Sequence, residues 1–308
     1  MREQTFVSAV YNLVRRDGTV RRSPEVLLQH GAYLLSLPVP LVLFVDPEFE
    51  EPCWEARRRL GLEALTRVVV RPLDEFDLAA LVPLLPRFRM AVNVDSVVKE
   101  TPWFQVLMWS KFDMVAEAIE SNPFGTEHFA WLDFAVAHVA VPPLTPPGPS
   151  EKIAMLEMMP VAPSEVEDRA EFYCYERGRM AGGFFWGSGE ALLHLRSRFS
   201  AELAAALALG LRPNEQMVLS LLSALEPDLF EMYYGDYAQI LLNWDGPRRR
   251  AVALRGGGNA VAGAERDGVF PEPGRTAARQ SGVVFLACAG GGWQRTLDRH
   301  REDSSGRR

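Results

Sequence analysis

The sequence predicts an α/β protein with a mostly parallel sheet flanked by helices. Short apolar runs alternate with longer segments whose apolar residues recur at helical spacing, which is the pattern of strand–helix–strand units. Several of the short runs are apolar throughout, as strands buried on both faces of a parallel sheet are. Two of them end on an acid, Asp46 and Asp133, and ligands of such sheets bind at the carboxyl ends of the strands.

The first half of the chain supplies four predicted strands and two predicted helices. The strands are the apolar or β-branched runs 5–11, 40–46, 66–73 and 127–141. One helix is predicted over 23–37, because Ser23 can cap it and Pro24 suits the first helical position. The other is predicted over 103–122 from the helical spacing of its apolar residues.

The second half follows a proline-rich connector, 142–150, which we expect to be stiff and exposed. It begins with two runs that look like strands, 154–161 and 171–176. Two helices follow, over 189–210 and over 213–227, and the second has Asn214 as its capping residue.

Residues 1–245 are expected to form one unit, with halves 1–141 and 151–245 on either side of the connector. The remainder, 246–308, is rich in Arg, Gly and Ala and has neither helical nor strand periodicity. Such low-complexity segments cannot bury enough apolar surface to fold, so we expect a disordered tail there.

Composition excludes some classes of partner. Residues 247–308 hold 12 basic and 6 acidic residues, which leaves 21 basic and 34 acidic residues in 1–246, a net charge of −13. A body this acidic offers no basic face for nucleic acid. The three cysteines lie far apart, the start lacks the apolar core of a signal peptide, and no stretch is long enough to span a bilayer. We therefore expect a cytoplasmic protein.

The stretch "WLDFAVAH", 131–138, holds the first candidate site residues. Asp133 can be a turn cap, or it can point into the crevice and hold a divalent cation or a ribose hydroxyl. His138 is either an ordinary core or turn histidine, or a second metal ligand or phosphate contact beside Asp133.

The stretch "AGGFFWGS", 181–188, holds the second group. Gly182 and Gly183 lack Cβ atoms, so a ligand or another chain segment can approach the backbone closely. Phe184 and Phe185, with Trp186, would then form an aromatic wall against the apolar face of a sugar ring. The alternative is a buried strand with a tight turn.

The remaining candidates are charged or polar. Glu215, in the first turn of the helix over 213–227, either complements the helix dipole or serves as a catalytic carboxylate, with Gln216 holding hydroxyls. Lys111, one of three lysines, is a candidate to neutralise a diphosphate, as are several N-terminal arginines. Two of these arginines, Arg15 and Arg21, flank a glycine loop, and Asp236 is a lesser candidate on the acceptor side, or a turn residue. The motifs of P-loop NTPases, α/β-hydrolases and HExxH metalloproteases are absent.

Four blocks of this chain, taken together and in order, resemble the HtrL/WlaTC (HtrL/YibB-like) family of bacterial proteins, which are regarded as glycosyltransferases linked to surface-polysaccharide gene clusters. They begin at "TFVSAVYNL", "SKFDMVAEAIESN", "AGGFFWGS" and "NEQMVLSLL". The resemblance implies a GT-A-like fold, with a Rossmann-like nucleotide half over 1–141 and an acceptor half over 151–245. A further likeness to blood-group-type galactosyltransferases implies that Gly182 and Gly183 line the sugar site and that Glu215 faces the anomeric carbon.

The resemblance implies a transferase that moves a sugar from a nucleoside-diphosphate sugar to a hydroxyl of a glycan, lipid-linked or small-molecule acceptor. One departure bears on its cofactor. GT-A enzymes generally carry Asp-x-Asp, and Ala135 stands where the second acid would be. A requirement for Mn²⁺ or Mg²⁺ is therefore open, and so is the alternative of a non-catalytic nucleotide-sugar-binding protein.

Overall fold

The computed structural model describes residues 4–18, 22–91, 100–139, 147–175 and 179–241, together with the backbone of 248–249. The candidate Arg21 and almost all of the predicted tail lie outside the described residues. In the described part of the chain, no helix is both long and apolar enough to cross a membrane.

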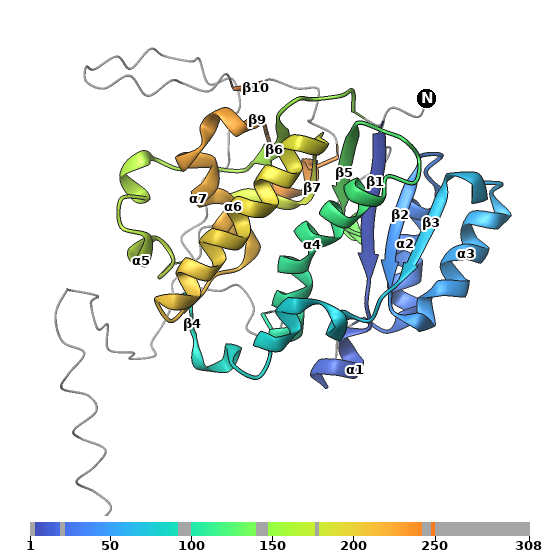
Figure 1. Ribbon diagram of the computed structural model, residues 1–308, viewed down its shortest axis with the longest axis horizontal. Coiled ribbons are helices and arrows are strands. Elements are labelled where there is room, and N and C mark those ends of the chain that lie inside the picture. The colour runs from blue at the N-terminus through green and yellow to red at the C-terminus, as the bar shows by residue number, and fades with distance from the viewer. Residues whose placement is uncertain are drawn as a thin grey trace, which may run out of the picture. The chain divides into compact units, whose positions relative to one another are not determined.

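An eight-stranded sheet forms the centre of the described structure, in the order β10-β9-β6-β7-β5-β1-β2-β3 (Figure 1). Its strands are β1 Gln4–Val10, β2 Leu41–Val45, β3 Thr66–Val70, β5 His128–Leu132, β6 Ile153–Glu157, β7 Met180–Ser188, β9 Phe230–Tyr234 and β10 Arg248–Arg249. β1 pairs in parallel with β2 and β5, and β2 with β3. β7 runs antiparallel to both of its neighbours, β5 and β6. The predicted α/β class with a mostly parallel sheet is confirmed.

The helices fall on the two faces of this sheet. They are α1 Leu13–Asp17, α2 Pro24–Ser36, α3 Glu50–Arg59, α4 Pro102–Ser121, α5 Arg169–Phe172, α6 Gly189–Ala208 and α7 Glu215–Leu225. Apolar residues of α4, α6 and α7 pack in one hydrophobic core, and those of α2 and α3 pack in a second core on the other face. Strand side chains alternate between the two cores, so the inner strands are buried on both sides.

Short elements complete the described structure. β4 Arg89–Met90 and β8 Leu211–Arg212 form a small parallel pair. The 3₁₀ turns are η1 Pro47–Phe49, η2 Glu63–Leu65, η3 Leu73–Glu75, η4 Asp77–Leu81, η5 Leu85–Arg87, η6 Val136–His138, η7 Pro163–Glu165, η8 Pro227–Leu229 and η9 Tyr237–Gln239.

The two predicted capping residues begin their helices as expected, whereas two predicted strands differ from the structure in type or in length. The side chains of Ser23 and Asn214 accept hydrogen bonds from the first turns of α2 and α7. The run predicted as a strand over 171–176 instead overlaps the short helix α5, whose Asp168 cap accepts from the Glu171 N–H. The strand predicted over 127–141 ends at Leu132, and a turn and η6 follow it.

Arg57 of α3 joins the outer helices to the sheet edge from a fully buried position. Its guanidinium donates to the carbonyls of Leu35, Leu37, Val39 and Leu65 and to the hydroxyl of Thr66. Burial lowers the pKa of Arg57 to about 10. One cation thus satisfies four carbonyls between α2, β2 and β3, and their hydrogen bonding depends on it.

We predict that Arg57→Met lowers the free energy of unfolding by at least about 3 kcal/mol, because several buried carbonyls lose their donors at once. Urea denaturation measures this loss. Arg59→Met on the same helix is the matched control, since Arg59 is exposed and its ion pair in the described part of the chain is with Glu55 at the surface, and it should change stability by less than about 1 kcal/mol. Equal effects of the two substitutions would contradict the role given to Arg57.

Candidate functional site

The reversed strand β7 brings two predicted site segments together. Asp133 follows β5 directly, and its backbone N–H donates to the carbonyl of Gly183 over 2.8 Å. Because β5 and β7 are antiparallel, the end of β5 lies beside the first residues of β7. The carboxylate of Asp133 and the two glycines therefore lie at the carboxyl edge of the parallel strands, where open α/β sheets bind ligands.

Lys111 lies at the centre of this edge and is completely buried. Its Nζ lies 3.3 Å from Glu215 Oε1 and 3.6 Å from Asp133 Oδ1, and it donates to the carbonyl of Gly182 over 3.1 Å. The same ammonium lies 5.4 Å from the centroid of the Trp131 ring. We call Lys111, Asp133 and Glu215 the Lys111 cluster.

The Lys111 cluster sets one ammonium against two carboxylates. Burial alone lowers the pKa of Lys111, but the carboxylates of Asp133 and Glu215 outweigh it, and the net shift is upward. Lys111 is therefore a cation whose charge is already matched by two acids. Its ammonium is also completely buried, which does not favour its predicted role against a diphosphate, and that role stays a prediction.

Asp133 connects the cluster to solvent. Its side chain is 30% exposed, whereas that of Glu215 is 9% exposed. Oδ1 of Asp133 accepts a hydrogen bond from Trp131 Nε1 over 2.7 Å and faces Lys111. Oδ2 is thus the oxygen left for a ligand.

The two glycines are required by the cluster itself. A Cβ on Gly182 would lie 2.7 Å from Glu215 Oε1. A Cβ on Gly183 would lie 2.6 Å from the hydroxyl of Tyr237 and 3.2 Å from Asp133 Oδ2. The glycines therefore allow polar atoms to lie directly against the backbone of β7.

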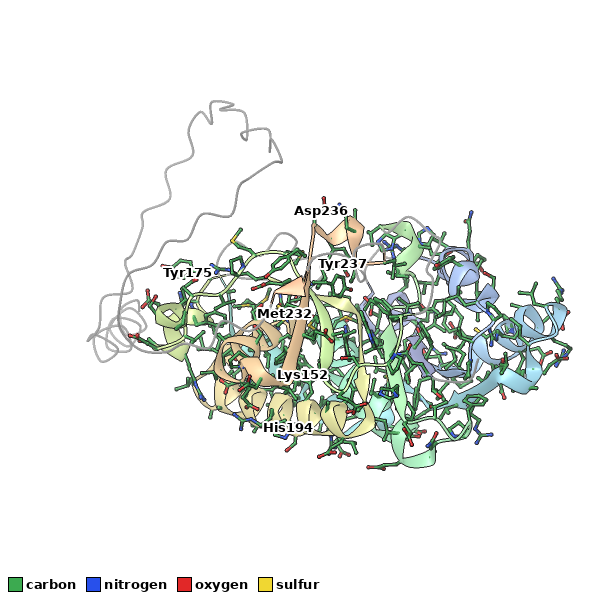
Figure 2. The ribbon with its side chains drawn as sticks, turned by 90° about the horizontal axis from the view of Figure 1, so that it is seen from above. Lys152, Tyr175, His194, Met232, Asp236 and Tyr237 are labelled. Carbon is green, nitrogen blue, oxygen red and sulfur yellow. The ribbon has the colours of Figure 1, made fainter. Side chains whose placement is uncertain are left out.

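Tyr237 is a site residue that the sequence reasoning missed. Burial raises the pKa of its phenol, and the negative charges of Asp133 and Glu215 raise it further. The neighbouring Asp236 was the candidate instead, but it is exposed, and its backbone N–H donates to the side-chain oxygen of Gln239 at the start of η9. Figure 2 shows Asp236 at the edge of the molecule, with Tyr237 nearer its centre. The aromatic residue directly after Asp236 was the available signal.

The predicted aromatic wall is wrong. Phe184 and Phe185 are completely buried, so neither presents a face to a ligand. They point to opposite sides of β7, where Phe184 stacks on Phe6 and Phe185 stacks on Phe112. A strand buried on both faces hides consecutive aromatic side chains equally well, which is the alternative that the sequence left open.

Two of the N-terminal arginines, Arg15 and Arg16, lie beside acids. Arg15 is exposed and lies 3.7 Å from Glu48. Arg16 pairs with both carboxylate oxygens of Asp46, at 2.5 and 2.8 Å, and with Asp74. The acid that ends β2 is therefore occupied by an arginine, and only the acid after β5 reaches the cluster.

His138 is not joined to Asp133 by any hydrogen bond or ion pair in the described residues. It stacks on His30 with ring centroids 5.5 Å apart, lies 3.5 Å from Arg22 Nη1, and contacts the carbonyl of Ala135 through Nδ1. Burial, with Arg22 and His30 nearby, lowers the pKa of His138. Within the described ranges no three His, Cys, Asp or Glu side chains gather as a metal site.

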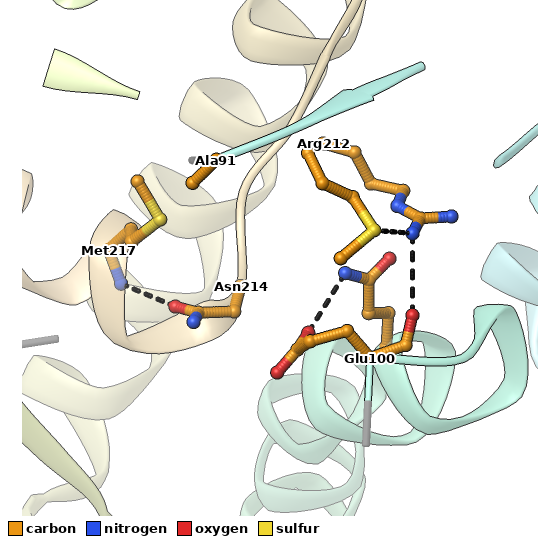
Figure 3. Close-up of a pocket in the computed structure, with 7 residues that line it drawn as sticks. Ala91, Glu100, Arg212, Asn214 and Met217 are labelled. Atoms are coloured by element: carbon orange, nitrogen blue, oxygen red, sulfur yellow. Dashed lines mark hydrogen bonds between the residues drawn. The ribbon is translucent and has the colours of Figure 1, made fainter. Parts of the chain in front are cut away.

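Asn214 fixes the first turn of α7, and with it Glu215. Its side chain accepts from the N–H of Met217 over 3.0 Å. Figure 3 shows a small pocket beside this cap, in which Arg212 donates to the carbonyl of Glu100 and contacts the sulfur of Met90. Gln216, the next residue of α7, is partly buried.

The protein is thus an α/β protein with an open sheet. Its candidate ligand site lies at the carboxyl ends of the parallel strands, where Lys111 lies between two carboxylates. The sequence profile of a family described as bacterial protein of unknown function (HtrL_YibB) matches residues 2–243. The chain belongs to this family, which confirms the resemblance found in its sequence. No curated protein matches.

Among solved structures, the chain is similar to the apo form of mouse xyloside xylosyltransferase 1. The identity is 13%, the TM-score is 0.40, and the match covers 75% of this chain and 84% of that chain. A likeness at this level carries no conclusion about activity.

We predict that Lys111→Met lowers the free energy of unfolding by about 3–5 kcal/mol, because two carboxylates lose their shared cation. Urea denaturation measures this. Lys152→Met is the matched control on an exposed lysine (Figure 2) and should be nearly neutral.

The double variant Lys111→Met/Glu215→Gln should regain part of the loss, since it removes one of the two uncompensated charges. If the double variant were less stable than Lys111→Met alone, the ion-pair account of the cluster would be wrong.

Proposed function

We propose that this protein is a GT-A-like glycosyltransferase that moves a sugar from a nucleoside-diphosphate sugar to a hydroxyl group of a glycan, lipid-linked or small-molecule acceptor. The observation that supports it most is the Lys111 cluster. It holds one solvent-facing carboxylate and one nearly buried carboxylate against two glycines at the carboxyl edge of the sheet. This combination suits a neutral, hydroxyl-rich ligand that approaches the backbone of β7.

Asp133 is proposed to bind the donor. Its free oxygen, Oδ2, can accept from ribose or sugar hydroxyls, and the phenol of Tyr237 lies over the same glycine, Gly183. The carboxylate and the phenol both lie beside Gly183, so two neighbouring hydroxyls of the donor can hydrogen-bond to them. Charged acceptors of this kind form stronger hydrogen bonds than neutral ones.

Glu215 is proposed as the catalytic carboxylate. It stands at the start of α7 and borders Gly182, so its carboxylate lies where the transferred sugar would pass β7. There it can accept a proton from the acceptor hydroxyl, or stabilise the positive charge that develops on the sugar ring. Lys111 acts as a positioning residue, because its ammonium fixes Oε1 of Glu215.

A divalent cation, Mn²⁺ or Mg²⁺, is compatible with this site. Mg²⁺ is commonly held by one or two carboxylates together with substrate phosphates and waters, and Asp133 Oδ2 is the carboxylate oxygen available for that. Such a cation would polarise the leaving diphosphate. His138, with its other partners, is not needed for it.

A second candidate function is a non-catalytic nucleotide-sugar-binding protein. One observation favours it: Glu215 is only 9% exposed and its Oε1 faces Lys111, which restricts the access of an acceptor. Under this reading, Asp133 and Tyr237 would bind the donor and no transfer would follow. For either function we propose a cytoplasmic protein that serves the synthesis of surface polysaccharide.

The two functions differ in turnover. A panel of nucleoside-diphosphate sugars is titrated with and without Mn²⁺, and slow release of the free nucleoside diphosphate is followed with and without glycan acceptors. The transferase reading expects binding together with slow release or transfer for at least one donor. Binding without release or transfer for any donor supports the binding protein, and no binding at all contradicts both.

For the donor that is turned over, we predict that Glu215→Gln lowers kcat by about 100-fold or more and changes donor affinity by less than about threefold, because the carboxylate acts at the reacting centre. Steady-state kinetics and donor titration separate the two effects. Glu190→Gln is the matched control, since Glu190 also lies in the first turn of a helix, α6, but is exposed. Full turnover in Glu215→Gln would remove Glu215 from the chemistry.

A further inference from the structure

We propose that Arg22, His30 and His138 form an anion-binding site that takes the diphosphate group of the donor. This inference rests on the proposed function, because the diphosphate is a part of the donor to which the buried Lys111 ammonium is not exposed. We call these three residues the Arg22 cluster.

The geometry gathers cationic and donor groups from two separate elements. His30 lies on α2, and His138 ends η6, the turn that follows Asp133. Their rings are nearly parallel, with an angle of 10° and centroids 5.5 Å apart. Arg22, just before α2, places Nη1 3.5 Å from His138 Nδ1.

Gly31 is what allows this approach. A Cβ on Gly31 would lie 2.0 Å from the ring of Phe134, the residue after Asp133. The absence of that Cβ lets α2 pack directly on the turn 133–138. His30 is thereby held beside His138, on the same turn that carries the donor-binding carboxylate.

No carboxylate of the described residues is paired with a member of the Arg22 cluster, although the charge of Asp133 acts on His138. Arg22 has no carboxylate partner there, and burial alone lowers its pKa. The neighbouring stretches 19–21 and 140–146 contain no acidic residue in their sequence. By contrast, Arg16 and Lys111 are each paired with two carboxylates. A positive group without a partner is available to an anion.

His30 adds a second ring to the cluster. His30 Nδ1 is buried and has no hydrogen-bond partner within the described part of the chain. Because protein atoms cover His30 Nδ1, a ligand would contact other atoms of this ring. Phosphate oxygens suit the donors gathered here, which are a guanidinium and ring N–H groups. The Arg22 guanidinium at this place would also stabilise the charge that develops on the leaving diphosphate.

The test uses inorganic pyrophosphate as the probe, titrated calorimetrically into the full chain in EDTA at constant ionic strength. We expect wild-type protein to bind pyrophosphate without metal. Arg22→Gln and His138→Gln should each weaken binding by about tenfold or more. The matched controls on α6 are Arg196→Gln and His194→Gln, whose side chains pair with acids elsewhere, and they should change the Kd by less than about twofold.

Melting temperatures of all variants show whether folding is retained, and Arg22→Lys provides a milder change at a partly exposed position. It keeps the charge and should weaken binding less than Arg22→Gln does. The proposal is overturned if the wild type does not bind pyrophosphate in EDTA, or if folded Arg22→Gln and His138→Gln bind it as the wild type does.

The two proposals can fail separately. Pyrophosphate binding that depends on Arg22, in a protein that turns over no donor, would leave the anion site standing and remove the transferase. Turnover with an unchanged donor KM in Arg22→Gln would retain the transferase and remove the anion site.

Discussion

The buried ammonium of Lys111 is the constraint on which the arrangement of the site depends. A charge without solvent must be matched by nearby carboxylates and carbonyls, and those partners come from the end of β5, the start of β7 and the start of α7. These elements must therefore meet at one point. The glycines of β7 follow from the same requirement, because side chains at 182 and 183 would occupy the space of the polar atoms.

Much of the fold could be predicted because its signals are local. The caps Ser23 and Asn214 and the apolar strands depend on neighbouring residues only. Two features could not be predicted in this way. Helix α3 is highly charged, and nothing in its sequence distinguishes the buried Arg57 from its exposed arginines. The carbonyls to which Arg57 donates are far from it in the sequence. The aromatic run 171–176 resembles a strand, although it begins within a helix capped by Asp168.

The site could be predicted in part, for a related reason. Asp133, Gly182, Gly183 and Glu215 stand out by residue type and by their place at the ends of elements. Which of them meet depends on the direction of β7, and the sequence does not specify it. Tyr237 escaped notice because its importance comes from its position over Gly183. The burial of Lys111 and its two acidic partners were not visible in the sequence either.

The support of α2 has a consequence for the thermodynamics of binding. Arg57 fixes the carbonyl of Leu35 in this helix and that of Leu37 just after it, while Gly31 seats the middle of the helix on the turn behind Asp133. His30 therefore lies on a helix that is held in place by two sets of contacts, one with Arg57 and one through Gly31. A ligand that reaches this edge meets groups already ordered by folding, so little conformational entropy is lost on binding.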